Sequence, residues 1–306
     1  MTDIVIIGSG IAGYSAAICL NQLNVDYKLI TGNKSNIKGQ LCMATVVSNY
    51  PGVNVNISGY NLMDFIEKQV KNESNKNNFI YNEVLSVDFN KTPFLLNTKD
   101  DVIDCKSIII CTGKHNNKLN LENEDKLSGK GISYCAVCDG FIYKNKIVSV
   151  VGGGDSAVRN AIYLSKIVSL VHLFVRRSEL RCNKKLFESV SSVSNIEIHY
   201  NTKIIDLIGS EYLESVNVIE NGVEVEYILD CVFVSIGASP NSEIFSDYLS
   251  LDENGYIITN NNCETNIKGI YAAGDIQSNT HKQAIIAAGN GYTAAMNAYN
   301  YIISSK

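Results

Sequence analysis

Two stretches of the chain repeat the same order of apolar and polar positions. Residues 3–7 form a short continuous apolar run, which is followed by glycines, by a helical pattern of apolar positions and by a second apolar run at residues 27–31. The same order returns at residues 146–177. Short apolar runs that alternate with helical patterns are typical of parallel strands joined by helices. The sequence therefore predicts two βαβ units that begin about half a chain apart.

A second pair of similar segments supports an internal duplication. Residues 102–113 and 227–237 both read as strands that carry an Asp-Cys pair and end in glycine, and a polar stretch follows each of them. One more strand-like run, residues 269–275, and a helix from about Lys282 most simply complete the first domain. The predicted fold is α/β, with two Rossmann-like dinucleotide-binding domains of the three-layer ββα type, the second inserted in the first. The expected domain bounds are 1–114 and 245–306 for the first domain and 115–244 for the inserted one.

Composition narrows the possible partners. The 306 residues are 45% apolar and carry a net charge of -5, which fits a soluble globular chain and makes nucleic acid a poor partner. The apolar runs are too short to cross a membrane, and the N-terminus lacks the basic start of a signal peptide. Nine cysteines are an odd number, and most lie in apolar surroundings, as is typical of buried thiols in a reducing compartment. A cytoplasmic protein is expected.

The first βαβ unit contains the motif GSGIAG. In this context the first glycine permits a tight turn, the second lets the backbone approach a pyrophosphate, and the third lets the helix pack on the strand. Gly8, Gly10 and Gly13 therefore predict a dinucleotide site at the helix N-terminus, and a purely structural glycine turn is the alternative. The acidic residue that usually contacts the ribose is missing, since the second strand ends in Thr31 and Gly32.

The second βαβ unit contains GGGDSA at residues 152–157, with alanine as a tolerated substitute for the third glycine. Its second strand ends in Arg176 and Arg177, and Arg181 follows. Guanidinium groups bind phosphate through two parallel hydrogen bonds, so arginines at the ribose end of such a unit favour the 2′-phosphate of NADPH. Three exposed arginines on a turn are the alternative interpretation.

Two nucleotide sites in one chain, one of them suited to NADPH, require an electron carrier, and a flavin is the usual one. In the motif YAAGD, Gly274 and Asp275 end a short strand just before a helix. A carboxylate at this position can accept hydrogen bonds from ribityl hydroxyls, while the helix N-terminus faces the polar edge of the flavin. A plain strand end is the alternative.

Cys135 and Cys138 stand three residues apart, with Asp139 directly after them. Structural zinc needs four ligands, and the sequence offers neither a second cysteine pair at a matching spacing nor a nearby histidine pair, so no metal is expected. A static disulfide would be reduced in the cytosol. The pair is therefore interpreted as a redox couple, with Asp139 as its proton carrier or, alternatively, as a turn residue. Four scattered histidines are expected to be structural or surface residues: His115, His172, His199 and His281.

The whole chain resembles the low-molecular-weight thioredoxin reductases. The motifs that carry the resemblance fall in the order of that family: GSGIAGYSAA, KGQL, NYPG, CTG, CAVCDGF, GGGDSAVRNAIYL, VRRSELR, SIGASPN and YAAGD. The resemblance implies an FAD domain built from both ends of the chain, an inserted NADPH domain, and a homodimer formed largely by FAD domains. NADPH then reduces FAD, which reduces the Cys135–Cys138 disulfide, which reduces thioredoxin or a thioredoxin-like protein. The NADPH domain rotates between the two half-reactions.

The resemblance also implies residue roles. Cys138 faces the flavin, Cys135 attacks thioredoxin, Asp139 is the acid, and Phe141 and Lys130 match partner-docking positions. The implied FAD contacts are Gly8, Ser9, Gly10, Ala12, Gly13, Gly39, Gln40, Leu41, Asn49, Val84, Thr112, Gly113, Gly274, Asp275, Gln283 and Ala284. Further cofactor-binding candidates are Thr31, Gly32 and Lys282. The NADPH candidates are Gly153, Gly154, Asp155, Ser156, Arg176, Arg177, Arg181, Ile236 and Gly237.

Two departures from the family pattern concern the electron donor. Val175 replaces a histidine of the family's arginine motif, and Arg159 and Asn160 stand where the family commonly has an acidic pair. Ferredoxin, the donor of a related branch, is therefore an alternative to NADPH, although the three retained arginines favour NADPH. A flavin-dependent dithiol oxidase is a second rival function, and a zinc-binding module is a third, outside the enzymes.

Overall fold

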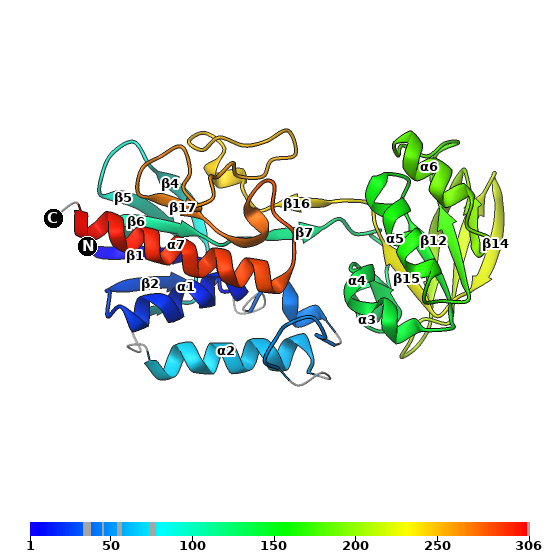
Figure 1. Cartoon of the computed structure of the whole chain (residues 1–306), viewed down its shortest axis with the longest axis horizontal. Helices are drawn as coiled ribbons and strands as arrows, with labels where there is room; N and C mark the ends of the chain where they lie inside the picture. Colours follow the sequence, from blue (N-terminus) through cyan, green and yellow to red (C-terminus); the bar gives the residue numbers. More distant parts are fainter. Residues whose placement is uncertain (33–37, 45, 54–56, 74–77, 305–306) are drawn as a thin grey trace. The chain divides into compact units, whose positions relative to one another are not determined.

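The computed structural model describes residues 1–32, 38–44, 46–53, 57–73 and 78–304. The chain forms two compact units (Figure 1). Unit 1 comprises Met1–Cys42, Asn49–His115 and Ser239–Lys306, and unit 2 comprises Met43–Ser48 and Asn116–Ala238. The predicted α/β class is confirmed by the sheets and helices described below, whereas the domain bounds expected from the sequence stay a prediction.

Unit 1 is built on a sheet of seven strands. A parallel part contains, in spatial order, β3 (Phe79–Ile80), β2 (Tyr27–Ile30), β1 (Thr2–Ile7) and β6 (Val102–Ile110). Two antiparallel strands continue it, β5 (Phe94–Thr98) and β4 (Val84–Asp88). The apolar run of β1 is buried on both faces, because Ile4 and Ile6 enter one core and Val5 and Ile7 enter the other.

Strand β6 has two partners along one edge. Its beginning pairs with β5, where Cys105 lies opposite Phe94, and its end pairs with β17 (Ile270–Ala272), where Ile108 lies opposite Ile270. The C-terminal part of the chain therefore completes the sheet of unit 1, as the sequence predicts.

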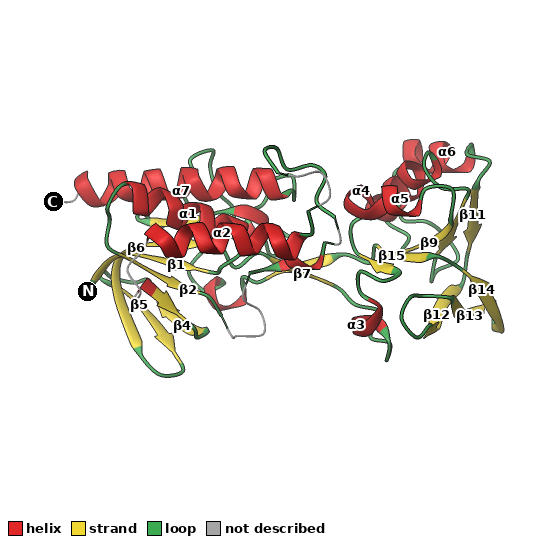
Figure 2. Ribbon diagram, turned by 90° about the horizontal axis from the view of Figure 1, so that it is seen from below, coloured by secondary structure: helices red, strands yellow, loops and turns green. Residues whose placement is uncertain are grey.

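Three helices cover one face of this sheet (Figure 2). They are α1 (Ile11–Gln22), α2 (Gly59–Glu73) and α7 (Ala284–Ser304). The helices α1 and α7 approach closely, since a Cβ atom on Gly291 would lie 2.0 Å from the carbonyl oxygen of Ala12. The described residues also form the 3₁₀ segments η1 (Gln40–Met43), η4 (Glu243–Phe245) and η5 (Gly274–Ile276), of which η1 ends at the first residue of unit 2.

Unit 2 contains a parallel sheet and an antiparallel one. The parallel strands, in spatial order, are β11 (Ile196–His199), β10 (Leu170–Phe174), β9 (Ile147–Val151), β15 (Cys231–Val234) and β8 (Ile132–Ser133). The antiparallel strands are β12 (Thr202–Ile208), β13 (Ser215–Glu220) and β14 (Val223–Ile228). The helical segments are α3 (Glu124–Leu127), α4 (Ala136–Asp139), η3 (Gly140–Tyr143), α5 (Asp155–Ser165) and α6 (Lys184–Ser191). Where the chain passes between the units, β7 (Lys114–Asn116) pairs with β16 (Ala238–Pro240).

The parallel strands of the two units follow one plan. The order β3-β2-β1-β6 with β17 beside β6 in unit 1 corresponds to β11-β10-β9-β15-β8 in unit 2. The internal repeat predicted from the sequence is therefore confirmed in the strand order.

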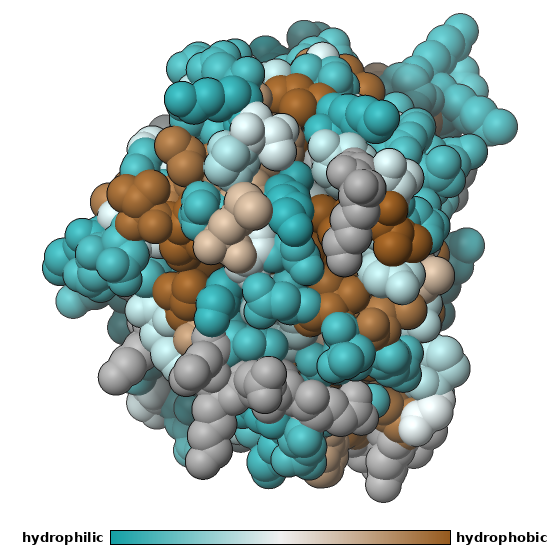
Figure 3. Space-filling view, turned by 90° about the vertical axis from the view of Figure 1, so that its left-hand side faces the viewer, coloured by the Kyte–Doolittle hydropathy of each residue, from teal (hydrophilic) through white to brown (hydrophobic). Residues whose placement is uncertain are grey.

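The surface of unit 1 is mixed. On the end that carries the chain termini, hydrophobic residues lie in small groups separated by polar ones (Figure 3). Among the described residues, no helix has both the length and the apolar character that a membrane span needs.

Candidate active site

The first glycine motif forms the turn between β1 and α1. Gly8 has a φ of 108°, and a Cβ atom there would lie 2.4 Å from the carbonyl oxygen of Cys111. A Cβ atom on Gly13 would lie 1.9 Å from the oxygen of Gly8, whereas one on Gly10 would meet nothing within 4 Å. The loop is tied to the end of β2, because the Ser9 hydroxyl donates to the carbonyl of Thr31 at 3.0 Å. The open side of Gly10, at the N-cap of α1, fits the close approach of a pyrophosphate.

The second glycine motif repeats this geometry in unit 2. Gly152 has a φ of 145°, and a Cβ atom there would lie 2.4 Å from the oxygen of Ser235, while a Cβ atom on Gly154 would meet nothing within 4 Å. Gly154 is the N-cap of α5, so Asp155 and Ser156 begin the helix beside it. Ile236 and Gly237 follow the end of β15, the strand next to β9. The structure therefore brings these NADPH candidates of the sequence to one edge of the parallel sheet.

The three arginines lie next to this second loop. The Arg181 backbone N–H donates to the carbonyl oxygen of Gly153 at 2.6 Å, and Arg176, Arg177 and Arg181 are all exposed. Val175 is buried directly beneath the loop, since its Cγ1 would lie 2.9 Å from a Cβ atom on Gly153. Val175, one of the departures from the family pattern, therefore packs against the second glycine loop.

The other departure from the family pattern is at Arg159 and Asn160, whose side chains both have partners within unit 2. Arg159 lies 3.9 Å from the carboxylate of Asp155, one helical turn away on α5. The amide of Asn160 donates to the Ser235 hydroxyl at 2.9 Å. Arg159 thus pairs within α5, and Asn160 ties α5 to the end of β15.

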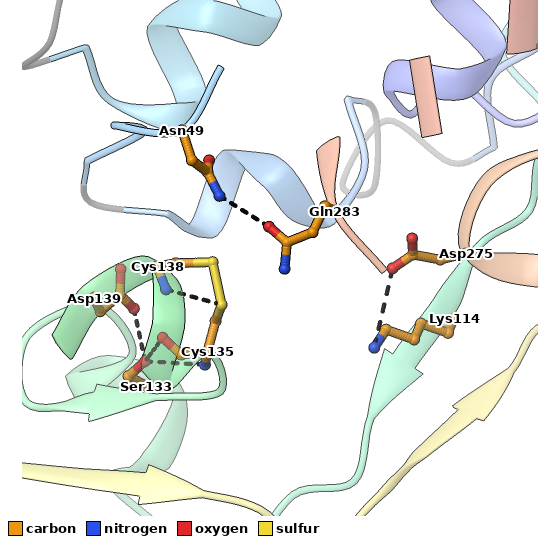
Figure 4. The surroundings of a disulfide bond; sticks show 8 residues. All are labelled: Asn49, Lys114, Ser133, Cys135, Cys138, Asp139, Asp275 and Gln283. Carbon is orange, nitrogen blue, oxygen red and sulfur yellow. Dashed lines mark hydrogen bonds and ion pairs between the residues drawn. A yellow bond between two sulfur atoms is a disulfide. The ribbon is translucent and has the colours of Figure 1, made fainter. Parts of the chain in front are cut away.

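In unit 1, two FAD candidates from distant parts of the sequence contact each other, and a third contacts a lysine that the sequence did not single out (Figure 4). The Asn49 amide donates to Gln283 Oε1 at 2.9 Å. The Lys114 ammonium lies 4.0 Å from the carboxylate of Asp275. Burial raises the pKa of Asp275, and the positive charges of Lys114 and Lys282 oppose that rise. A half-buried carboxylate beside these cations fits the role of acceptor for a polyol hydroxyl.

Other FAD candidates of unit 1 also contact residues that are distant from them in the sequence or bond to backbone carbonyl groups. The Gln40 amide donates to the Lys114 carbonyl at 2.5 Å, and Thr112 exchanges two hydrogen bonds with Asn241 at 2.7 and 2.8 Å. Lys282 donates to the Gln277 carbonyl and lies over the ring of Tyr256. Val84 belongs to β4, at the edge of the sheet.

Cys135 and Cys138 are bonded to each other in the described structure (Figure 4). Cys135 is the N-cap of α4, and the Cys138 backbone N–H points at its sulfur at 3.2 Å. Both cysteines are half-buried, while Val137 and Phe141 beside them are exposed. The disulfide is therefore reachable from solvent through a small apolar surface.

Asp139 directly follows Cys138 and lies in a nearly dry position, with 8% of its surface exposed. The Ser133 hydroxyl donates to Asp139 Oδ2 at 2.6 Å, and the same hydroxyl accepts from the Cys135 backbone N–H at 3.1 Å. Asp139 Oδ1 has no partner among the described residues. Burial raises the pKa of Asp139, and the Ser133 hydrogen bond opposes that rise. The carboxyl group thus keeps a proton to higher pH than an exposed aspartate and is suited to deliver it.

Ser133 was not identified from the sequence. It stands two residues before Cys135, and only the fold shows that its hydroxyl connects the backbone of Cys135 to the carboxylate of Asp139. The sequence offers no signal for it beyond its position in the SYCAVCDGF segment.

The thiols outside the motif behave differently. Cys19, Cys105, Cys111 and Cys231 are buried, as predicted from their apolar surroundings. Burial raises the pKa of Cys105 to about 12 and also raises the pKa of the other three. A thiol with a raised pKa stays protonated at neutral pH, so these four buried cysteines are poor nucleophiles.

The histidines are not all scattered, contrary to the expectation from the sequence. His172 Nδ1 lies 3.1 Å from His199 Nε2, because β10 and β11 are neighbours in the sheet. Because these two histidines are far apart in the sequence, their spacing gives no indication of this contact.

Comparison with known proteins decides the family. Residues 2–291 match the sequence profile of the pyridine nucleotide-disulphide oxidoreductases. The chain is 37% identical to the thioredoxin reductase of Borreliella burgdorferi over 303 residues, which cover 98% of this chain and 92% of that protein. The chain belongs to the thioredoxin reductases of this family. The resemblance found in the sequence is thereby confirmed.

Two further comparisons agree with this membership. The chain is 36% identical to NADPH-dependent thioredoxin reductase 3 of Arabidopsis thaliana, and the match covers 99% of this chain but only 59% of that protein. A solved thioredoxin reductase structure from Streptococcus pyogenes superimposes with a TM-score of 0.93 at 30% identity, covering 99% of both chains. The fold of the family member thus extends over the full length of this chain.

Proposed function

We propose that this protein is a thioredoxin reductase that uses FAD to reduce the disulfide of thioredoxin, or of a thioredoxin-like protein, with NADPH. The observation that carries this proposal is the Cys135–Cys138 disulfide with the buried Asp139 directly after it, in a unit that also holds a dinucleotide-type glycine loop. The net reaction is NADPH + H⁺ + thioredoxin disulfide giving NADP⁺ + thioredoxin dithiol.

The two glycine loops take different cofactors in this proposal. Unit 1 holds FAD with its pyrophosphate at Gly10, and unit 2 holds NADPH with its pyrophosphate at Gly154. FAD, when bound, carries the electron pair from NADPH to the disulfide. Asp275 and the Asn49–Gln283 pair are the residues of unit 1 that would hold FAD by hydrogen bonds. The predicted rotation of one unit between half-reactions belongs to the same proposal.

The cysteines and Asp139 have separate roles in the second half-reaction, the reduction of thioredoxin. The Cys135 thiolate attacks one sulfur of the thioredoxin disulfide, and the other thioredoxin sulfur leaves as a thiolate that takes up a proton. Cys138 then attacks the Cys135 sulfur of the mixed disulfide, which releases thioredoxin as its dithiol and restores the Cys135–Cys138 bond. Asp139, held by Ser133 with one carboxylate oxygen unpaired among the described residues, supplies the proton.

Titration of the FAD-loaded protein with NADPH in the absence of oxygen tests the donor. We expect the flavin absorbance to bleach completely at about two NADPH per chain, because the Cys135–Cys138 disulfide and FAD each accept one electron pair, and a thioredoxin-coupled disulfide assay to show turnover. Reduced ferredoxin serves as the matched donor, because Val175 and Arg159 depart from the family's NADPH motif. Bleaching by ferredoxin alone would overturn the assignment of NADPH. Rapid peroxide formation with a small dithiol and no turnover of thioredoxin would instead identify a dithiol oxidase.

Replacing Arg176 and Arg181 together by alanine tests which nucleotide is read. We expect the KM for NADPH to rise at least about tenfold and the KM for NADH to change little, because charged hydrogen bonds of about 1.5–3 kcal/mol each are lost only with the 2′-phosphate. Steady-state kinetics with both nucleotides measures this difference. The matched control replaces Lys184 and Lys185, two exposed cations on α6, by alanine. A rise of equal size for NADH and NADPH would contradict the proposed role.

The partner surface and the assembly complete the proposal. Thioredoxin docks on the exposed apolar side chains of Val137, Phe141 and Ile142 beside the disulfide, with Lys130 nearby in the chain.

A homodimer forms through unit 1, where Tyr60 and Phe65 of α2 and Ile286 and Tyr292 of α7 are exposed large hydrophobic residues. The compartment proposed is the cytoplasm, where thiols such as Cys42 and Cys182 stay reduced.

A further inference from the structure

Three side chains at the edge of the parallel sheet of unit 2 are arranged like the ligands of a metal ion. They are His172 of β10 and Glu197 and His199 of β11. His172 lies opposite Glu197 in the parallel register, and residues two apart on a strand point to the same face. All three side chains therefore share one face of the sheet. Among the residues that the structure describes, this is the one group of three or more such side chains close enough to share an ion.

We propose that His172, Glu197 and His199 bind a zinc-like divalent cation in unit 2. The distances between the ligand atoms carry this proposal. Nδ1 of His172 lies 3.1 Å from Nε2 of His199 and 3.4 Å from Oε2 of Glu197. Nε2 of His199 and Oε2 of Glu197 are 3.8 Å apart. A tetrahedral zinc ion with bonds of about 2.0–2.2 Å holds its ligand atoms about 3.3–3.6 Å apart. The three atoms thus need to move only by tenths of an ångström to share one ion.

A second layer of contacts orients His199. Its Nδ1 lies 3.0 Å from the carboxylate of Glu220 and 3.2 Å from the Tyr227 hydroxyl, which itself donates to Glu220 at 2.7 Å. A proton held on Nδ1 by these acceptors leaves Nε2 as a lone pair. Such a carboxylate–histidine–metal arrangement is the usual support of a zinc ligand. His172 completes the set when its own proton lies on Nε2, so that Nδ1 faces the ion.

Burial and openness at the site fit a bound ion with one exchangeable position. The side chains of His172 and His199 are only 10% and 14% exposed, whereas that of Glu197 is 56% exposed. The ring of His199 packs against the rings of Phe174 and Tyr227, with centroid distances of 5.4 and 5.2 Å. The centroids of Phe174 and Tyr227 lie 5.1 Å apart. The histidines thus fix the position of the ion, and the open side at Glu197 leaves room for a water molecule as fourth ligand.

The contacts around the ligands connect the two sheets of unit 2, although the three ligands themselves all lie in one sheet. His172 and the β11 ligands belong to the five-stranded parallel sheet, whereas Glu220 and Tyr227 belong to β13 and β14 of the antiparallel sheet. Metal binding therefore ties β10 directly to β11, and it reaches the antiparallel sheet only through the contacts of His199 with Glu220 and Tyr227.

Zinc binding by the tag-free, FAD-loaded full chain tests the site. The protein is kept oxidised, so that the Cys135–Cys138 disulfide cannot act as a chelator, and zinc is titrated against a chromophoric chelator. We expect one zinc per chain and a higher midpoint of thermal unfolding with zinc. Glu197→Gln, on an exposed side chain, should weaken binding at least about tenfold without unfolding the protein, and Glu220→Gln should weaken it about 10–100-fold.

The matched control is His115→Gln, which removes an exposed histidine outside the cluster and should leave zinc affinity unchanged. His199→Gln should abolish binding. Two results would overturn the proposal: no zinc bound by the parent protein at equimolar concentration, or the same zinc affinity in the parent, Glu197→Gln and His199→Gln proteins. In either case the two histidines form only a hydrogen-bonded pair.

Discussion

Replacing Cys138 by serine is expected to abolish thioredoxin reduction while NADPH oxidation with a small-molecule electron acceptor continues. Serine cannot form the disulfide that Cys138 makes with Cys135, so Cys135 alone can attack thioredoxin but cannot be released from the mixed disulfide. We expect kcat/KM for thioredoxin to fall by at least about 10³-fold, which corresponds to about 4 kcal/mol of transition-state stabilisation. A thioredoxin-coupled assay and a dye-reduction assay on the same preparation measure the two activities separately.

The control for this variant is Cys182→Ser, because Cys182 is another half-buried cysteine of unit 2 and has no disulfide partner. It should keep both activities. A Cys138→Ser protein that reduces thioredoxin at the parent rate would show that the motif is not the electron carrier, whereas loss of both activities would place its effect in the fold or in FAD binding.

Serine at Gly10 and serine at Gly13 are expected to fail in different ways. A Cβ atom on Gly13 would lie 1.9 Å from the oxygen of Gly8, so Gly13→Ser should destabilise the protein by about 1–3 kcal/mol or more. Gly10 has room for a side chain, and serine is a favoured N-cap residue, so Gly10→Ser should leave the stability of the FAD-free protein nearly unchanged. Its side chain would nevertheless occupy the approach of the pyrophosphate and prevent FAD binding.

Urea unfolding of the FAD-free proteins and a fluorescence titration with FAD separate these two effects. The corresponding change in unit 2 is Gly154→Ser, because Gly154 is the N-cap of α5 and has room for a side chain, and it should affect NADPH and leave FAD bound. Tight FAD binding by Gly10→Ser would contradict the placement of the pyrophosphate at the start of α1.

The strands and glycine loops could be predicted because their signals are local. Continuous apolar runs such as residues 3–7 must be buried on both faces, and the spacing of Gly8, Gly10 and Gly13 reflects contacts within one turn of chain. The redox pair was recognisable for the same reason, since Cys135 and Cys138 are neighbours in sequence as well as in space.

Features that depend on strand register or on distant segments could not be predicted in this way. The contact between His172 and His199 requires β10 and β11 to be adjacent and correctly aligned, and 27 residues separate the two in sequence. The Asn49–Gln283 hydrogen bond joins residues that are 234 apart. For these two candidates only the family resemblance gave a reason to name them together, and the resemblance gave none for the histidines.

The two partners of β6 have a consequence for the order in which the chain acquires structure during synthesis. The strands of unit 2 all lie between Ile132 and Val234, so they emerge from the ribosome before Ile270–Ala272 of β17. Until those residues appear, the end of β6 at Ile108–Ile110 has a free edge, and α7 is not yet present to cover the core above it. We therefore expect unit 2 of the nascent chain to become protected from proteases first. Unit 1, which unit 2 interrupts, should become protected only once its C-terminal residues have been synthesised.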